Sequence, residues 1–356
     1  MSTVNQLRPL FALFQQGQLQ DYVTALIWSS RGDCLAMASA AGEVVLIDPS
    51  GNQQILLEAQ DSAIDTLQFS ADGHWLAAAG QAGTLYCWGI RPEAIALAWT
   101  LEHAGNWIDQ LAWHPTEPLL AFGVGRYVQI GDIPQRRVIA TLPCEKSSAL
   151  GLAWHPQGDW LAVGAQQAIK LWSGSDWNAA PQTLEMVSAC VSLAVSPEGE
   201  YIASGNLDRT LLVWQQGKWE QPWRMQGFSG KVRQVAWSMP RVGTAPLLAC
   251  ASGESVVLWK KQSQDEMGWE PRMLELHQAR VEAIDFHPKS LLLASAAADG
   301  FLGLWRKGRL LTQILEGTSQ GFSTLAWHPS GQLLAAGGQA GEWLVWKAQR
   351  SGKGFA

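Results

Sequence analysis

Short stretches of alternating apolar and polar residues recur along the whole chain, separated by turns rich in Pro, Gly, Asp and Ser. The segments at 190–214, 281–305 and 322–346 share one plan: an alternating stretch, a Ser-Pro or His-Pro turn, an apolar run, a polar turn, and a second alternating stretch that ends on Trp. Alternation with a period of two is typical of β-strands with one buried face. No segment keeps the period of a helix, so the pattern predicts an all-β protein.

Two independent markers indicate an eightfold repeat. The residue that ends the first alternating stretch recurs every 41 to 49 residues, and the residue that ends the second stretch keeps nearly the same spacing. A period near 40 residues is typical of repeat architectures. The extra length lies around 215–230 and 260–280, where we expect loops. The first markers are Trp28, Phe69, Trp113, Trp154, Val195, Trp237, Phe286 and Trp327, and the second are Ile47, Trp88, Ile130, Trp172, Trp214, Trp259, Trp305 and Trp346.

Each repeat is expected to form a four-stranded sheet, because a further short strand, such as RVIATLP at 137–143, precedes each first stretch. Sheets that are apolar on both faces must stack, so the repeats are predicted to form the blades of one closed propeller domain that spans 1–356. The last repeat runs into the polar tail 347–356 without an outer strand, and RPLFALFQ at 8–15 is free to supply it. This predicts a ring that is sealed by an N-terminal strand completing the last blade.

The repeats resemble those of the WD-repeat (WD40-type) family of β-propellers, and the resemblance covers essentially the whole chain. Members of that family often carry a hydrogen-bonded set of His, Ser or Thr, Asp and Trp within a blade. The fifth repeat keeps Ser204, Asp208 and Trp214 but has Met186 at the His position, and no closing Trp is followed by the Asp of the eponymous dipeptide. Seven blades, the family's common number, remain the alternative to the eight counted here. The seventh repeat supplies a full set at His277, Ser295, Asp299 and Trp305.

The resemblance implies a non-catalytic scaffold that mediates protein–protein interaction or the assembly of a multiprotein complex. It implies no cofactor. Two other hypotheses remain open: a stable subunit of a larger complex that docks through tryptophans on its outer strands, and a propeller enzyme or small-molecule binder that uses the axial channel.

Composition and charge narrow the partners and the compartment. The formal net charge is −6, from 25 Lys and Arg against 31 Asp and Glu, so there is no basic surplus to bind nucleic acid. No apolar run approaches the ~18 residues that cross a bilayer, so no membrane insertion is expected. The N-terminus lacks a secretory pattern, and five scattered Cys without a CxxC pair suit buried, reduced thiols. We therefore predict a cytoplasmic protein.

Repeated His residues and one His-Ser-Asp set invite a search for catalytic or metal chemistry. Zinc ligands all lie about 2 Å from one ion, whereas equivalent turns of neighbouring blades are far apart, so a role in the turn is favoured over a metal site. His277, Ser295 and Asp299 match a hydrolytic triad in composition, but in a blade they are expected to rigidify the sheet. The adjacent cysteines and docking motif of the quinoprotein dehydrogenases are missing. The repeated histidines are His114, His155, His287 and His328.

The 20 Trp residues fall into separate groups. Most are markers or strand residues that the repeat itself explains. Four lie in the connections that follow repeats four to six, where the period requires no large aromatic side chain. Aromatic residues are enriched at interfaces, so we consider these four as an outer-strand aromatic patch, with simple covering of the outer strands as the alternative. They are Trp177, Trp219, Trp223 and Trp269.

The mouth of the expected channel has a mildly acidic rim. The second residue of each first strand includes three acids, Asp65, Asp109 and Glu282, against the single base Arg233. Nearby loops add Gln81, Trp107 and Gln339. Because an acidic rim attracts cations, we expect this partner-binding face to take a segment that carries Lys or Arg. A solvated rim without a partner is the alternative.

Overall fold

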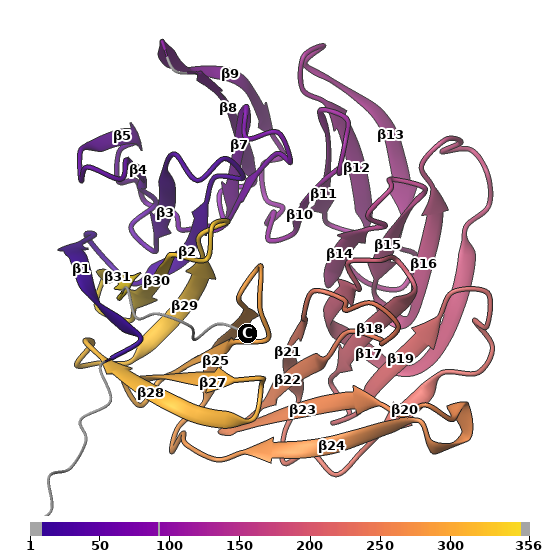
Figure 1. Ribbon diagram of the computed structural model, residues 1–356. Coiled ribbons are helices and arrows are strands. Elements are labelled where there is room, and N and C mark those ends of the chain that lie inside the picture. The colour runs from indigo at the N-terminus through magenta and orange to yellow at the C-terminus, as the bar shows by residue number, and fades with distance from the viewer. Residues whose placement is uncertain (1–8, 92, 350–356) are drawn as a thin grey trace, which may run out of the picture.

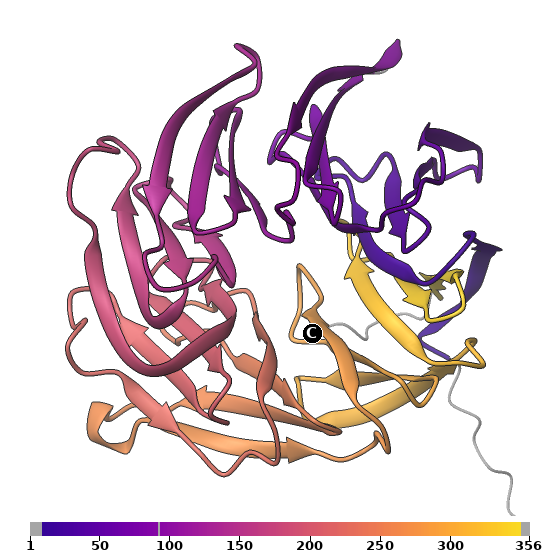
Figure 2. The ribbon, with the colours of Figure 1, turned by 180° about the vertical axis from the view of Figure 1, so that it is seen from behind.

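The computed structural model describes residues 9–91 and 93–349, and these residues form an all-β protein. Thirty-one strands are joined by short turns, and the only helix in the described part is the short 3₁₀ segment Asp265–Met267. Figures 1 and 2 show sheets that radiate from a common centre, in chain order around it. The predicted all-β class is confirmed.

Six of the sheets have four antiparallel strands each. Two of them hold β2 (Val23–Trp28), β3 (Leu35–Ser39), β4 (Val44–Ile47) and β5 (Gln53–Leu57), and β6 (Ile64–Phe69), β7 (Trp75–Gly80), β8 (Thr84–Arg91) and β9 (Ala94–Glu102). A third holds β10 (Leu111–Trp113), β11 (Leu119–Val124), β12 (Tyr127–Asp132) and β13 (Arg137–Pro143). The next two hold β21 (Val232–Trp237), β22 (Leu248–Ser252), β23 (Ser255–Lys261) and β24 (Trp269–Leu274), and β25 (Val281–Phe286), β26 (Leu293–Ala297), β27 (Phe301–Arg306) and β28 (Leu310–Glu316). The sixth holds β1 (Phe11–Gln18), β31 (Glu342–Ala348), β30 (Leu333–Gly338) and β29 (Phe322–Trp327).

The seventh sheet joins two repeats through one long strand. It has seven strands in chain order, of which β17 spans 14 residues. The first part of β17 pairs with β16 and its last part with β18, so the sheet contains two four-stranded units that share this strand. Its strands are β14 (Gly151–Trp154), β15 (Trp160–Gly164), β16 (Gln166–Ser173), β17 (Gln182–Val195), β18 (Tyr201–Asn206), β19 (Leu211–Gln215) and β20 (Trp223–Met225).

The repeat markers coincide with strand ends. Each of the eight first markers, from Trp28 to Trp327, is the last residue of the innermost strand of its unit. These innermost strands contact one another in the order β2, β6, β10, β14, β17, β21, β25 and β29, and β29 also contacts β2. Apolar clusters fill the space between neighbouring sheets, so both faces of a sheet are buried.

The N-terminal strand joins the sheet of the last repeat, as predicted, although it runs over Phe11–Gln18 rather than 8–15. β1 pairs with β31 from Phe11 opposite Ala348 to Gln18 opposite Glu342. Phe11 is 1% exposed and packs edge-on against Trp327, with ring centroids 5.4 Å apart. β31 includes the first two residues of the predicted polar tail 347–356, so that tail is shorter than predicted, and residues 350–356 lie outside the described residues.

Tryptophans of the inner strands connect consecutive sheets. The indole Nε1 of Trp154 donates to the carbonyl of Ala112 at 3.0 Å, and the Nε1 of Trp327 donates to that of Asp285 at 3.1 Å. Trp113 and Trp237 make the same bond to the preceding sheet. A buried indole N–H usually finds a hydrogen-bond partner. Here the partner is a carbonyl on the inner strand of the preceding sheet. These Trp residues therefore fix the spacing between sheets as well as filling the core.

Candidate functional site

Asp65 and Gln81 meet at the end of the second sheet where its inner strand begins. Asp65 is the second residue of β6, and Gln81 directly follows β7. The backbone N–H of Gln81 donates to the carbonyl of Ala63 at 3.1 Å. The side-chain amide of Gln81 donates to Oδ1 of Asp65 at 3.4 Å. The turn after β7 therefore folds over the Asp65 carboxylate.

The loop before β10 adds Trp107 and Asp109 to this corner. Its central residue, Ile108, is fully buried, and its backbone N–H donates to the carbonyl of Gly80 at 3.1 Å. Burial of Ile108 turns its two neighbours outward, so Trp107 is 63% exposed and Asp109 is exposed as well. Asp65, Gln81, Trp107 and Asp109 are hereafter the acidic corner. A Lys or Arg head group can pair with carboxylates and stack on an exposed indole, so this loop carries both kinds of group that attract a cation.

The two carboxylates of the acidic corner lack a positive partner among the described residues. Partial burial raises the pKa of Asp65, and the negative charge of Asp109 raises it further, against the opposing hydrogen bond from Gln81. Partial burial also raises the pKa of Asp109. Both effects penalise the ionised form, and a bound cation would relieve them. The acidic corner therefore holds two carboxylates whose ionised forms are penalised by burial and, for Asp65, by the charge of Asp109.

The other predicted rim residues, Arg233, Glu282 and Gln339, belong to other sheets, and two of them already have partners within the protein. Glu282 forms an ion pair with Arg280, with Nη2 and Oε1 2.6 Å apart, which cancels its charge locally. Arg233 is exposed on β21, and the amide of Gln339 donates to the carbonyl of Phe322 at 3.3 Å. Arg280 was not predicted at the rim because it directly precedes the inner strand β25, outside the strand positions that indicated the rim. The rim is therefore less uniformly acidic than predicted, and its unpaired acids are concentrated at the acidic corner.

Hydrogen bonds join the predicted set of the seventh repeat. Trp305 Nε1 donates to Ser295 Oγ at 2.9 Å, His277 Nε2 lies 2.8 Å from the same oxygen, and His277 Nδ1 lies 3.3 Å from Oδ2 of Asp299. Burial lowers the pKa of His277, against the opposing charge of Asp299. A neutral imidazole that donates from Nδ1 to the carboxylate accepts the Ser295 hydroxyl proton at Nε2. Because Ser295 is fully buried, this arrangement stiffens the sheet and offers no nucleophile to a substrate.

The fifth repeat replaces its missing His with another polar chain. Ser204 Oγ donates to Oδ1 of Asn206 at 2.6 Å, and Nδ2 of Asn206 donates to Oγ1 of Thr210 at 3.0 Å. The Thr210 hydroxyl donates in turn to Asp208 at 2.6 Å. Asn206 therefore does in this sheet what His277 does in the seventh repeat. The family pattern did not predict the role of Asn206, because that pattern concerns a His before the first strand and says nothing about position 206.

The four tryptophans of the predicted outer-strand patch do not form one exposed surface. Trp177 packs edge-on against Trp154 at 5.8 Å, and Trp219 packs against Trp160 at 6.3 Å. Trp223 and Trp269 lie 6.3 Å apart in a third cluster that includes Tyr201 and Trp237. Trp269 is buried, and the other three are half-buried. The four indoles therefore belong to three ring clusters, and their role as an outer-strand interface stays a prediction.

The four His-Pro histidines lie between sheets and do not converge. Nε2 of His328 donates to the carbonyl of Gly32 at 2.9 Å, which joins the last repeat to the first. His114 and His287 stack edge-on against Trp154 and Trp327 of the following sheets. Among the described residues no group of three or more His, Cys, Asp or Glu side chains is placed to hold a metal ion. These histidines are therefore turn residues, as predicted. Their contact with the next sheet was not predicted.

All five cysteines are free and buried, as predicted. Burial raises the pKa of Cys34 to about 12 and that of Cys144 to about 11, which suppresses the reactive thiolate. Within the described ranges, no helix has the length and apolar character needed to cross a membrane.

Comparison with known proteins adds to this geometry. The family model described as "WD domain, G-beta repeat" matches residues 51–89, 136–173, 183–215, 269–306 and 309–347, just over half of the chain. Protein HIR1 of Kluyveromyces lactis is 22% identical over 169 residues, which cover 40% of this chain and 19% of HIR1. The human Protein SEC13 homolog is 27% identical over 127 residues, which cover 33% of this chain and 39% of that protein. The chain therefore matches well under half the length of either relative.

Proposed function

The chain belongs to the WD-repeat family, and we propose on that premise that it is a non-catalytic scaffold on which other proteins assemble. The family match supports a general role in protein interaction. Further support is that the His-Ser-Asp set of the seventh repeat is buried and engaged in holding its own sheet. A cytoplasmic location remains a prediction, in keeping with five free, buried thiols.

The proposed architecture is a single domain over 1–356, closed as a ring of eight blades. Three contacts between the first and last repeats support closure: β29 against β2, β1 paired with β31, and the hydrogen bond from His328 to Gly32. The seven-stranded sheet counts as two blades because β17 serves as the outer strand of one and the inner strand of the next. An experimental structure would test both the closure and the blade number.

The proposed contact surface is the acidic corner, which takes a partner segment that carries Lys or Arg. The observation that carries this proposal is the pair of carboxylates, Asp65 and Asp109, that repel each other and form no ion pair in the described part of the chain; the exposed Trp107 belongs to the same loop as Asp109. A Lys or Arg side chain would relieve the repulsion between the two acids and would gain a contact with the ring face. Arg233, Glu282 and Gln339 would lie at the margin of this surface.

A charge-reversal experiment tests the acidic corner. We expect Asp65→Lys/Asp109→Lys to weaken binding of a fluorescein-labelled Lys/Arg peptide about tenfold or more, and we expect Trp107→Ala to weaken it less. The matched control is Glu185→Lys/Glu220→Lys, which makes the same charge change at exposed residues of other sheets. Unchanged affinity in the Asp65/Asp109 variant, measured by fluorescence anisotropy, would refute this surface. An equal loss in the control would show that only net charge matters.

A further inference from the structure

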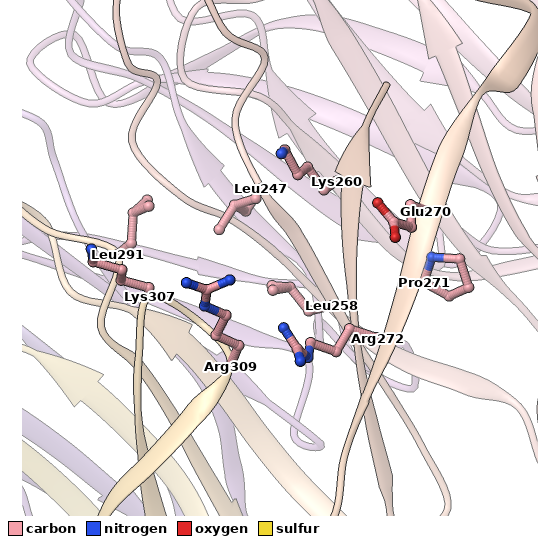
Figure 3. Close-up of a pocket in the computed structure, with 9 residues that line it drawn as sticks. All are labelled: Leu247, Leu258, Lys260, Glu270, Pro271, Arg272, Leu291, Lys307 and Arg309. Carbon is pink, nitrogen blue, oxygen red and sulfur yellow. The ribbon is translucent and has the colours of Figure 1, made fainter. Parts of the chain in front are cut away.

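A second concave surface lies between the sheet of β21–β24 and the sheet of β25–β28. It consists of two adjoining depressions, with volumes of about 510 Å³ and 600 Å³, that share Leu247, Lys260 and Leu291. Figure 3 shows the first depression, with side chains from β23, β24 and the β27–β28 turn around it. We call the joined depressions the basic groove. Both volumes lie within the range of natural ligand pockets, about 300 to 1,000 Å³.

Positive charge is concentrated in the basic groove. Four of the nine residues that line the first depression are Lys or Arg, against the one acid Glu270, and Arg241 lines the second depression. Within residues 9–91 and 93–349 none of these five cations forms an ion pair. Glu270 accepts a hydrogen bond from Nε2 of Gln262 at 2.6 Å. The four cations of the first depression are Lys260, Arg272, Lys307 and Arg309.

The floor of the basic groove is apolar. Leu258 is 5% exposed, Leu247 and Leu291 are half-buried, and Pro271 forms part of the wall. Leu258, Arg272 and Arg309 line the same depression, and Figure 3 shows them in one view of it. The groove therefore offers a place for an aliphatic side chain, with cations around it.

A tight turn puts two of the cations in place. Lys307 and Gly308 both have positive φ, 54° and 61°, and the N–H of Gly308 donates to the carbonyl of Trp305 at 3.1 Å. Gly308 packs so closely on Leu258 that a Cβ atom there would lie 3.0 Å from its Cδ2. Glycine adopts this conformation at the least cost, and a Cβ at position 308 would also press on Leu258. Lys307 and Arg309 are therefore held over the apolar floor from either side of Gly308.

The basic groove and the acidic corner lie at opposite ends of the inner strands. β25 and β27 run in the same direction, because both are antiparallel to β26, and Phe286 and Trp305 are level with each other opposite Leu293. The turn that carries Lys307 and Arg309 therefore lies beyond the last residue of the inner strand. Asp65 lies near the first residue of its own inner strand. The two surfaces face in opposite directions along the strands.

We propose that the basic groove binds an acidic segment of a partner protein that inserts an aliphatic side chain over Leu258. Carboxylates pair bidentately with Arg, and the five cations lack other partners in the described structure. The elongated shape and the apolar floor fit a peptide segment better than a single small anion. A nucleic acid is disfavoured because the chain as a whole carries a net charge of −6. This proposal is independent of the one for the acidic corner.

Fluorescence anisotropy with short labelled peptides tests the basic groove. The probe contains Asp, Glu and Leu; a second peptide replaces each acid by its amide, and a third replaces Leu by Ser. We expect the first to bind tightest and to weaken as salt is raised. Arg272→Glu/Arg309→Glu should weaken its binding by about tenfold or more, and Arg272→Gln/Arg309→Gln should weaken it by a smaller factor in the same direction.

The matched control is Arg126→Glu/Arg137→Glu, which makes the same charge change at exposed residues of the β10–β13 region. This control and Asp65→Lys/Asp109→Lys should leave affinity for the acidic probe close to wild type. Absence of wild-type binding, equal binding of the amide peptide, or an equal loss in the Arg126/Arg137 control would overturn the proposal. So would light scattering that shows a dimer of the wild type which Arg272→Glu/Arg309→Glu converts to a monomer, because a second copy of the chain would then fill the groove. Thermal unfolding of each variant verifies that it is folded.

Discussion

The buried hydroxyl of Ser295 holds two other buried side chains of its repeat in place. Its hydroxyl oxygen is the common partner of Trp305 Nε1 and His277 Nε2. Each of these nitrogens would be buried without a partner if that oxygen were removed. An unsatisfied buried donor or acceptor is costly, so the whole set depends on one oxygen atom.

We therefore expect Ser295→Ala to lower the free energy of unfolding by about 1 to 3 kcal/mol, because it leaves two buried groups unpaired. Urea denaturation followed by Trp fluorescence would measure the change. Ser263→Ala, at an exposed position, is the control and should be nearly neutral. A loss below about 0.5 kcal/mol for Ser295→Ala would mean that solvent or a rearranged side chain takes over the bonds.

Asp285 gives the protein a specific pH dependence. Burial raises its pKa to about 7, although backbone N–H groups of Trp327 and Phe286 partly stabilise the carboxylate. The unfolded-state pKa is about 3.9, so between about pH 4 and 7 the folded state binds the extra proton. The free energy of unfolding is therefore higher at low pH and falls as the pH rises from about 4 toward 7, because the buried carboxyl must then ionise.

We expect Asp285→Asn to be more stable relative to the wild type at pH 8 than at pH 5, by roughly 2 to 4 kcal/mol, because the amide never ionises. Thermal or urea unfolding at the two pH values would give this difference. A stability difference that does not change with pH would mean that Asp285 is ionised and solvated throughout the range.

The strands were largely predictable, because period-two alternation and turn residues are local signals. All eight first markers are the last residues of inner strands. The alternation did not predict that Gln182–Val195 forms one strand. The strand continues through this stretch because it has no Gly, Pro, Asn or Asp to end the pairing.

The candidate site was predicted only in part. The burial of Trp269 and the convergence of cations at the basic groove depend on side chains that are distant in sequence, whereas the ion pair of Arg280 with Glu282 joins residues only two apart.

β1 lets the two faces of one strand be compared directly. Phe11 is 1% exposed and Phe14 is 43% exposed, although both belong to the strand that pairs with β31. We expect Phe11→Ala to lower the free energy of unfolding by about 3 to 4 kcal/mol, because it opens a cavity beside Trp327. Phe14→Ala is the control and should cost below about 1 kcal/mol. Equal losses, measured by urea denaturation, would mean that β1 contributes through backbone pairing alone.

At the scale of the whole molecule, charge is separated between the two ends of the strands. The acidic corner lies where inner strands begin, and the basic groove lies beyond their other end. Proteins whose charges differ could therefore bind at the same time without competing for space. Mutations at distant sites that share no partner usually act independently.

We expect Asp65→Lys/Asp109→Lys to abolish most binding of the Lys/Arg peptide without changing affinity for the acidic peptide, and Arg272→Glu/Arg309→Glu to do the reverse. Titrating each peptide in the presence of saturating amounts of the other should give affinities close to those measured alone. Competition between the peptides, beyond their own mutual attraction in a protein-free control, would contradict two separate surfaces.

The pairing of β1 with β31 also sets an order of events during synthesis. Among the strands of the described residues, β1 is synthesised first, and β31, the one strand of this set with which it pairs, is synthesised last. Phe11 must therefore wait, without its native cover, until nearly every other strand has been made. Pairing between distant parts of a chain is slow, and an apolar strand left open in the meantime invites wrong partners. The nascent chain is thus most vulnerable to aggregation before β31 emerges, and a chaperone that shields residues 11–18 would protect it during that interval.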